Sequence, residues 1–204
     1  MAKFILIRHG ETEWNRNERF RGREDLLLNN TGLKQAVAAS LALKNRPIEA
    51  IYSSPLKRTM QTAKPLAEQL DITVQYIEGL IDINYGDWQG LTPEEAQETD
   101  SKMYADWLHA PHTVRFPQGE SLQIVRQRIT TAVNELAEKH GDAMVALVSH
   151  KVVCQVLICA MLGLDNSHFW QIRQDVCAIN SFEFKDGESI VNLVNDTCHL
   201  QNLN

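Results

Sequence analysis

Near its start the chain reads Phe4-Ile5-Leu6-Ile7-Arg8-His9-Gly10-Glu11-Thr12, an apolar run followed at once by polar or small residues. The run is too short to span a membrane and too apolar for a surface loop, so it predicts one short buried strand. A histidine at the end of such a strand is placed for chemistry on an anion, because the glycine lets a ligand come close and the arginine offers donors that match phosphate oxygens. Alone, the segment leaves two interpretations open: a ligand site, or a strand end that happens to be polar.

The size of the chain fits one α/β domain. It has 204 residues, 44% of them hydrophobic, so we expect residues 1–204 to form a single domain with a full core. The formal net charge of −6 argues against non-specific binding to nucleic acid or to an anionic membrane. An anionic ligand must then be attracted by a local cationic pocket.

Cysteine usage and the apolar stretches predict a cytoplasmic protein. We expect no leader peptide, because the chain leads directly into its first predicted strand, and residues 152–164, the most apolar stretch elsewhere, are shorter than the ~20 residues that a membrane helix needs. The four cysteines show neither a Cys-x-x-Cys pair nor a histidine spacing suited to zinc, which predicts free thiols that act as small core residues, at Cys154, Cys159, Cys177 and Cys198.

Strand and helix signals alternate along the chain. Apolar runs predict further strands at residues 50–53, 73–76 and 143–148, the last of them apolar throughout, as in a parallel strand buried on both faces. Helical spacing predicts helices between the strands, and the first, with Thr31 as its N-cap, is expected to bury Leu33, Val37 and Leu41. The others are expected after Pro55, over residues 93–108, from Leu122 to Gly141, and after His150.

This order of elements predicts a three-layer α/β/α fold with an open, mostly parallel sheet. Residues 178–194 predict an antiparallel hairpin at the edge of the sheet. Residues 85–120, here called the cover segment, are expected to form a lid-like excursion over the carboxyl edge. Open sheets of this kind bind ligands at that edge, where His9, Ser53 and His150 each follow a strand.

Cationic groups and a helix start are predicted to meet on this edge. Arg58 falls in the first turn of the helix after the second strand, and Ser149-His150 opens the helix after the buried strand. A helix N-terminus presents unpaired N–H groups to an anion. Two arginines, two histidines and a helix start therefore predict a phosphate pocket that uses no metal and no cofactor.

Four ordered motifs resemble the signatures of the histidine phosphatase superfamily, which has a phosphoglycerate mutase-like fold. They run in order over nearly the whole chain, and they are Arg8-His9-Gly10-Glu11-Thr12 with Asn15, Ser53-Ser54-Pro55-Leu56-x-Arg58-x-x-Gln61-Thr62-Ala63, Leu80-x-Asp82-x-x-x-Gly86-x-Trp88-x-Gly90, and Val148-Ser149-His150.

The resemblance implies a role for each of these residues. His9 would attack phosphorus and form a phosphohistidine, for which it must be neutral, and Arg8 and Arg58 lower its proton affinity as like charges do. These arginines and His150 would hold the phosphoryl oxygens, with Asn15 as a neutral donor. Asp82 stands where the family mostly uses glutamate and would be the general acid and then the base, with Glu11 as the alternative acid.

Other residues are assigned to the entrance or to packing. Arg21, Gly22 and the acid loop would line the entrance, and Tyr85 stands where related phosphatases can carry a histidine that helps to recognise the substrate. Lys151 replaces a glycine common in the family, and it would either bind a substrate carboxylate or point outward, which we favour. Packing, solvent or structural roles are favoured for the remaining candidates, Trp88, Trp107, His109, His112 and His199.

Hydrolysis is favoured over phosphoryl transfer between substrates. A mutase must exclude water and hold a bisphosphate, whereas Lys102 and Arg115 are the only arginine or lysine residues between Gly90 and Gly119. The motifs around Trp107, Gly119 and His199 resemble those of metal-independent bacterial phosphoserine phosphatases acting on a small phosphorylated metabolite. The alternatives are an alpha-ribazole or broad-specificity sugar phosphatase, a phosphoglycerate mutase and a phosphate-dependent binding module.

The oligomeric state stays open. The edge hairpin, with Phe182 and Phe184 taken as exposed apolar residues, permits a homodimer without requiring one.

Overall fold

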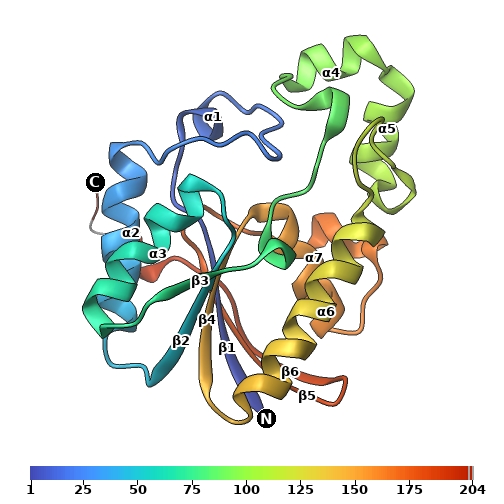
Figure 1. The fold of residues 1–204 in the computed structure, drawn as a ribbon. Coiled ribbons are helices and arrows are strands. Elements are labelled where there is room, and N and C mark those ends of the chain that lie inside the picture. The colour runs from blue at the N-terminus through green and yellow to red at the C-terminus, as the bar shows by residue number, and fades with distance from the viewer. Residues whose placement is uncertain (202, 204) are drawn as a thin grey trace.

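The computed structural model describes residues 1–201 and 203 of the chain. Its centre is a six-stranded sheet with the strand order β3-β2-β4-β1-β5-β6 (Figure 1). The strands are β1 (Ala2–Arg8), β2 (Ile48–Ser53), β3 (Val74–Tyr76), β4 (Met144–Ser149), β5 (Ile179–Lys185) and β6 (Glu188–Asp196). The first four pair in parallel and the last two form an antiparallel hairpin on β1, as the sequence predicts.

Helices cover both faces of the sheet (Figure 1). The longer helices are α2 (Asn30–Leu43) and α3 (Lys57–Leu70) on one face, and α6 (Leu122–His140) and α7 (Lys151–Met161) on the other. Successive side chains of β1 point to opposite faces, so that Ile5 and Ile7 join the core with α2 and α3, while Phe4 and Leu6 join the core with α6 and α7. The parallel strands are therefore buried on both sides.

Shorter elements form the connections. They are α1 (Glu13–Arg16), η1 (Glu78–Leu80), η2 (Gly86–Trp88), α4 (Pro93–Thr99), α5 (Ser101–His109), η3 (Pro111–Thr113), η4 (Asn166–Gln171) and η5 (Cys198–Leu200).

The buried face of α2 differs from the predicted one. Leu33, Val37 and Leu41 are 43%, 49% and 57% exposed, and the helix instead buries small residues together with Leu43. A Cβ on Gly32 would lie 2.1 Å from the carbonyl oxygen of Glu11, so this face fits directly against the turn after β1. That close approach fixes the rotation of the helix. The N-cap is Asn29, whose side chain accepts from the Gly32 amide, and not Thr31.

The hairpin also differs from prediction in what it exposes. Phe182 and Phe184 on β5 are 2% and 6% exposed, because β5 lies between β1 and β6 and turns this face onto the core, where Phe182 stacks on Phe4. The exposed hydrophobic residues of the edge lie on β6 instead, at Ile190, Leu193 and Val194.

The cover segment lies beyond the carboxyl ends of the parallel strands (Figure 1). The predicted helix over 93–108 is two helices, because Asp100 leaves helical geometry and its side chain caps α5 by accepting from the Met103 amide. Trp107 is buried at 3% exposure, whereas Leu108, predicted on the same apolar face, is 44% exposed.

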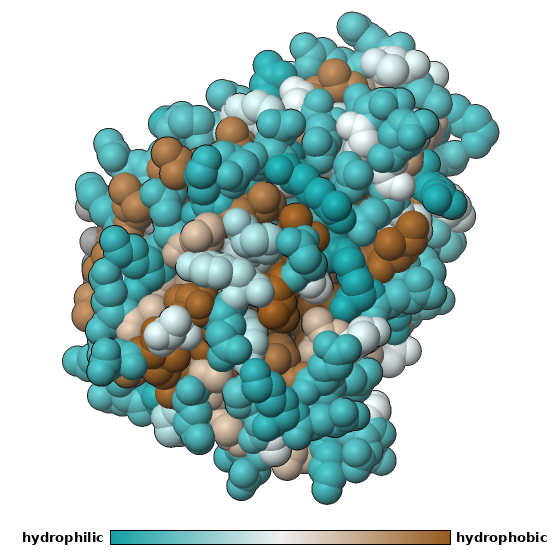
Figure 2. Space-filling view, viewed as in Figure 1, coloured by the Kyte–Doolittle hydropathy of each residue, from teal (hydrophilic) through white to brown (hydrophobic). Residues whose placement is uncertain are grey.

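The surface of the protein is mainly hydrophilic on the face shown in Figure 2, and hydrophobic residues appear there in small groups. All four cysteines are free, and three of them are buried as predicted, but Cys198 is exposed. Among the described residues, every helix is too short or too polar to traverse a lipid bilayer.

Candidate active site

The ends of β1, β2 and β4 bring the first, second and last motifs together. In the sheet Arg8 pairs with Ser149, and the His9 amide donates to the Ser149 carbonyl at 2.9 Å. The Ser54 amide donates to the Val148 carbonyl at 3.0 Å. The rings of His9 and His150 consequently lie with their centroids 5.3 Å apart.

The His9 imidazole is buried and presents one unoccupied nitrogen. Its Nδ1 lies 2.7 Å from the Gly10 carbonyl, which can only accept, so Nδ1 carries the proton. Its Nε2 is buried and has no hydrogen-bond partner. Burial, and then the charges of Arg58 and Arg8, hold the pKa of His9 well below its usual value. The ring is therefore neutral with a free lone pair on Nε2.

Arg58, fully buried, is the hub of a polar network beneath the cavity. Its Nε donates to His150 Nδ1 at 3.1 Å, and its Nη2 donates to Asp82 Oδ2 at 3.0 Å and to the Gly22 carbonyl at 2.7 Å. The last contact depends on a tight turn, since Gly22 has φ +49° and a Cβ there would lie 2.6 Å from Gln89 Oε1. Asp82 Oδ1 accepts from the Ile83 amide at 2.9 Å.

His150 is held as a neutral imidazole of defined tautomer. Arg58 Nε can only donate, so His150 Nδ1 accepts, and Nε2 donates to Ser54 Oγ at 2.8 Å. Burial, and then the charge of Arg58, hold the pKa of His150 well below its usual value. Oδ2 of Asp82 lies 3.6 Å from His150 Nδ1.

Two further guanidinium groups have donors without partners. Arg8 donates through Nη1 to the Gln174 carbonyl at 2.6 Å, and Arg21 donates through Nη1 to the Trp14 carbonyl at 3.2 Å. The Nε of each is buried and unpartnered. Burial and the charge of Arg21 lower the pKa of Arg8 to about 10. Unsatisfied cationic donors of this kind are what a phosphate group would saturate.

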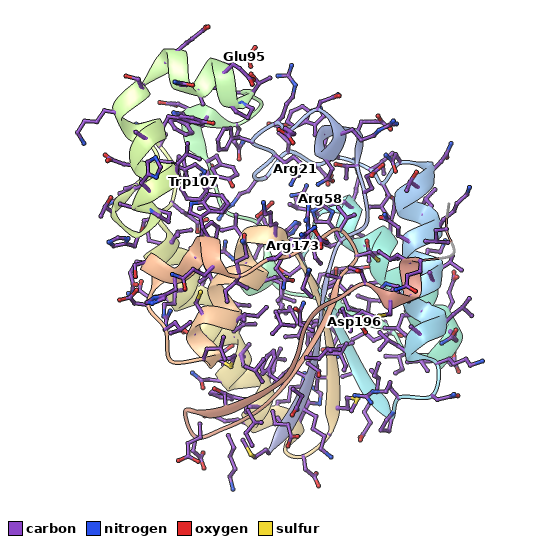
Figure 3. The ribbon with its side chains drawn as sticks, turned by 180° about the vertical axis from the view of Figure 1, so that it is seen from behind. Arg21, Arg58, Glu95, Trp107, Arg173 and Asp196 are labelled. Carbon is purple, nitrogen blue, oxygen red and sulfur yellow. The ribbon has the colours of Figure 1, made fainter. Side chains whose placement is uncertain are left out.

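A cavity of about 370 Å³ opens above this network. Arg8 and Asp82 line it together with side chains of the cover segment, α7 and η4. Figure 3 shows Arg58 and Arg21 beyond the strand ends, with Trp107 in the neighbouring cover segment. The cationic side chains on its wall are Arg8, Arg19, Arg21 and Lys151, and the acidic ones are Glu18 and Asp82.

Seven of the ten predicted site residues line this cavity, whereas His9, Arg58 and His150 are fully buried and are not part of its wall. Asn15 lines it, although its Oδ1 also caps α1 by accepting from the Thr12 amide and hydroxyl. Tyr85 and Gly22 line it as well. Glu11, the alternative acid, is not part of the wall, and its carboxylate accepts from Asn29 Nδ2 at 2.7 Å.

Lys151 differs from its favoured prediction. It lines the cavity, with Nζ 5.4 Å from the centre of the Trp170 ring, and does not point outward. Lys151 is the first residue of α7, directly after the buried N-cap residue His150, and this end of the helix lies at the cavity.

The packing residues behave largely as predicted. Trp88 and Trp107 are 1% and 3% exposed, although Trp107 also reaches the cavity wall. His109 and His112 are exposed, and the Nε2 of His199 lies 3.1 Å from the Cys177 carbonyl. In residues 1–201 and 203, no three His, Cys, Asp or Glu side chains gather in an arrangement that could hold a metal ion.

Sequence reasoning missed Glu18 and Arg19 on the cavity wall, and it missed two further contributors. The main-chain carbonyl of Gln174 orients Arg8. Such a contact could not be predicted from the sequence, because every residue has a main-chain carbonyl. Gln155 lines the cavity from α7 and is buried. The sequence signal that could have indicated it is a glutamine within an otherwise apolar stretch.

Comparisons with known proteins agree with this geometry. The chain is 36% identical over 200 residues to phosphoserine phosphatase 1 of Hydrogenobacter thermophilus, a match that covers 98% of this chain and 95% of that protein. Its fold is similar to that of YhfR from Bacillus stearothermophilus, with a TM-score of 0.94, 29% identity, and coverage of 98% of this chain and 100% of that one. It is also similar to a phosphoserine phosphatase mutant from Entamoeba histolytica solved with phosphoserine, with a TM-score of 0.89, 29% identity, and coverage of 98% and 100%.

The sequence profile described as "Histidine phosphatase superfamily (branch 1)" matches residues 4–197. With its four motifs gathered at one edge of the sheet, the chain belongs to the histidine phosphatase superfamily.

Proposed function

We propose that this protein is a phosphomonoesterase that hydrolyses a small phosphorylated metabolite through a phosphohistidine at His9. The observation that carries the proposal is the buried, unpartnered Nε2 of a neutral His9 among three guanidinium groups. A lone pair in that setting is a nucleophile, and the cations beside it stabilise the charge that the attacked phosphoryl group spreads over its oxygens.

The first step transfers the phosphoryl group to the enzyme. His9 Nε2 forms a bond to phosphorus as the bond between phosphorus and the ester oxygen breaks. Donors of Arg8, Arg21 and Arg58 hold the phosphoryl oxygens. Asp82, which lies at the cavity and against Arg58, gives a proton to the leaving oxygen, which departs as an alcohol.

The second step returns the enzyme to its starting state. Water attacks the phosphohistidine while Asp82, now a carboxylate, takes the proton from that water. The bond between phosphorus and Nε2 breaks, and inorganic phosphate leaves. The Gly10 carbonyl holds the Nδ1 proton throughout, so that Nε2 is again the basic nitrogen.

Hydrolysis fits this site better than transfer to a second substrate. The side chains that the cover segment places on the cavity wall carry no cation, and they are Tyr85, Pro93, Tyr104, Trp107 and Leu108. Its basic residue Lys102 instead pairs with Asp106 on the surface, and Arg115 is exposed. The cover segment therefore offers no charge to hold a second phosphate.

Phosphoserine is the substrate we propose first. Relatives named as phosphoserine phosphatases support it, and the cations on the wall offer partners for a carboxylate as well as for a phosphate. Alpha-ribazole phosphate and sugar phosphates are the competing substrates.

The test is phosphate release from a panel of phosphomonoesters with a metal chelator present. We expect activity, highest on phosphoserine, and an acid-labile phosphoprotein on rapid quenching. His9→Ala should lower kcat by more than about 1,000-fold and abolish the phosphoprotein. Activity that the chelator abolishes, or that survives His9→Ala, would contradict the phosphohistidine route.

A further inference from the structure

Two side chains on α7 face the cavity and have no place in the phosphoryl chemistry. Lys151 and Gln155 are separated by four residues, which places them on one side of the helix, one turn apart. Both line the cavity that Arg8 and Asp82 also line. A phosphate held by Arg8 would consequently leave the rest of the substrate facing this part of α7.

The amide of Gln155 has a fixed orientation with a free acceptor. Its Nε2 donates to the Ile172 carbonyl at 2.6 Å and to the Phe169 carbonyl at 3.4 Å, and carbonyls can only accept, so the nitrogen and oxygen are assigned without ambiguity. Gln155 is 2% exposed and its Oε1 is buried without a partner. A buried unpaired acceptor is costly, so a donor on a ligand that reaches it is strongly favoured.

Lys151 provides the opposite kind of group. Its ammonium lies 5.4 Å from the centre of the Trp170 ring, which restrains the side chain above the cavity. Burial lowers the pKa of Lys151 to about 8, and the charges of Arg8 and Arg21, which crowd this wall with cations, add to the shift. An added anion relieves that crowding.

We propose that Lys151 and Gln155 form a subsite for the α-amino acid end of the substrate, in which the Lys151 ammonium binds the carboxylate and Gln155 Oε1 accepts from the α-ammonium group. This inference rests on the proposed phosphatase function and deepens it. A cation and an unpaired acceptor one turn apart match the two charged groups of an amino acid. A sugar phosphate would leave the Lys151 charge unpaired. A phosphoglycerate would offer Gln155 only a neutral hydroxyl.

The subsite is tested with substrates that carry one, both or neither of the recognised groups. O-phosphoserine has both, phosphoethanolamine has the ammonium only, 3-phosphoglycerate has the carboxylate with a hydroxyl, and p-nitrophenyl phosphate has neither. We expect Lys151→Met to lower kcat/KM about 10- to 100-fold for the two carboxylates, mainly through KM, and less than about 3-fold for the other two. Lys151→Arg should restore most of the loss.

Gln155→Leu gives the complementary pattern. We expect kcat/KM to fall about 10- to 100-fold for O-phosphoserine and phosphoethanolamine, and by clearly less for 3-phosphoglycerate and p-nitrophenyl phosphate. Lys102→Met is the matched control, because Lys102 is exposed on α5 and lies outside the cavity wall. It should leave all four substrates unchanged.

Three outcomes would overturn the subsite. The first is that Lys151→Met leaves the ratio of kcat/KM values among the four substrates unchanged. The second is an equal loss of kcat/KM on all four substrates, which would assign Lys151 to the phosphate. The third is a wild-type enzyme whose kcat/KM for p-nitrophenyl phosphate equals that for O-phosphoserine. Failure of the phosphatase function looks different, because the wild type would then release phosphate from none of them. In that case calorimetry on His9→Ala decides the subsite, since Lys151→Met must weaken binding of O-phosphoserine and leave binding of phosphoethanolamine intact.

Discussion

The imidazoles of His9 and His150 are fully buried beside Arg58, and this placement has a thermodynamic cost. In the unfolded chain each ring takes up a proton near its usual pKa. In the folded protein, burial and the neighbouring guanidinium groups keep each ring neutral. The folded pKa of both groups lies below the unfolded one. The same arrangement that frees Nε2 of His9 for attack thus makes the fold sensitive to acid.

The free energy of unfolding should fall as the pH drops below about 6.5. Above that value both rings are neutral in both states, so their contribution is fully present, whereas below it only the unfolded chain takes up the protons. Each histidine then contributes a slope of about 1.4 kcal/mol per pH unit. Urea unfolding between pH 7.5 and 5.5 measures it.

His9→Ala is the control for this slope. It removes one of the two buried imidazoles, so the stability should depend on pH by about 1.4 kcal/mol per unit less than in the wild type. Equal slopes in the two proteins would show that His9 takes up a proton as readily in the folded state as in the unfolded one, which would contradict its lowered pKa.

Sequence patterns predicted the central residues of the site well and the residues at its rim poorly. Arg8, His9, Arg58 and His150 could be placed together because each lies within two residues of a strand end or at a helix start, and parallel strands end at one edge. The direction of Lys151 and the free oxygen of Gln155 depend on how α7 is rotated against the sheet. Packing sets that rotation, and spacing alone does not encode it.

Helix α2 shows what a close approach does to an element. Its buried side carries Gly32, Ala36 and Ala39, and its exposed side carries larger aliphatic residues. A hydrophobic pattern predicts the opposite rotation, because it weighs the size of apolar side chains and takes no account of backbone contact. The contact of Gly32 with the turn after β1, which holds Gly10 and Glu11, decided the outcome.

Two leucines of α2 make this difference measurable. Leu43 is 4% exposed, so Leu43→Ala should lower the free energy of unfolding by about 2–4 kcal/mol through a lost core contact and a cavity. Leu41 is 57% exposed, and Leu41→Ala should change it by less than about 0.5 kcal/mol. Chemical denaturation of the pair is the measurement, and comparable losses would mean that α2 is rotated the other way in solution.

At the scale of the whole molecule, the cover segment is built into the main core. Trp107 packs against Phe116, Phe169 and Trp170, and the Trp170 indole donates to its carbonyl at 2.8 Å. The segment also pairs with the loop after α1, where the Gly90 amide donates to the Phe20 carbonyl. We therefore propose that the cover segment and the sheet unfold as one cooperative domain.

Trp107→Ala tests that proposal. It should lower the free energy of unfolding of the entire chain by about 3–5 kcal/mol, with near-ultraviolet and far-ultraviolet circular dichroism still changing together. Two separate transitions, with only the tryptophan signal shifted, would show that the cover segment is an independent unit. Lys102→Met on the same segment should leave the transition in place.

The order of strands in the sheet also has a consequence for how the protein is made. β1 is the first strand to leave the ribosome, yet both its neighbours, β4 and β5, come from the last third of the chain, and the main chain of His9 bonds to Ser149 and Cys177. At about 5–20 residues per second, translation keeps that strand waiting on the order of ten seconds. The nascent polypeptide therefore carries an unpaired apolar strand until β4 and β5 have been made, and His9 gains its main-chain partners only then.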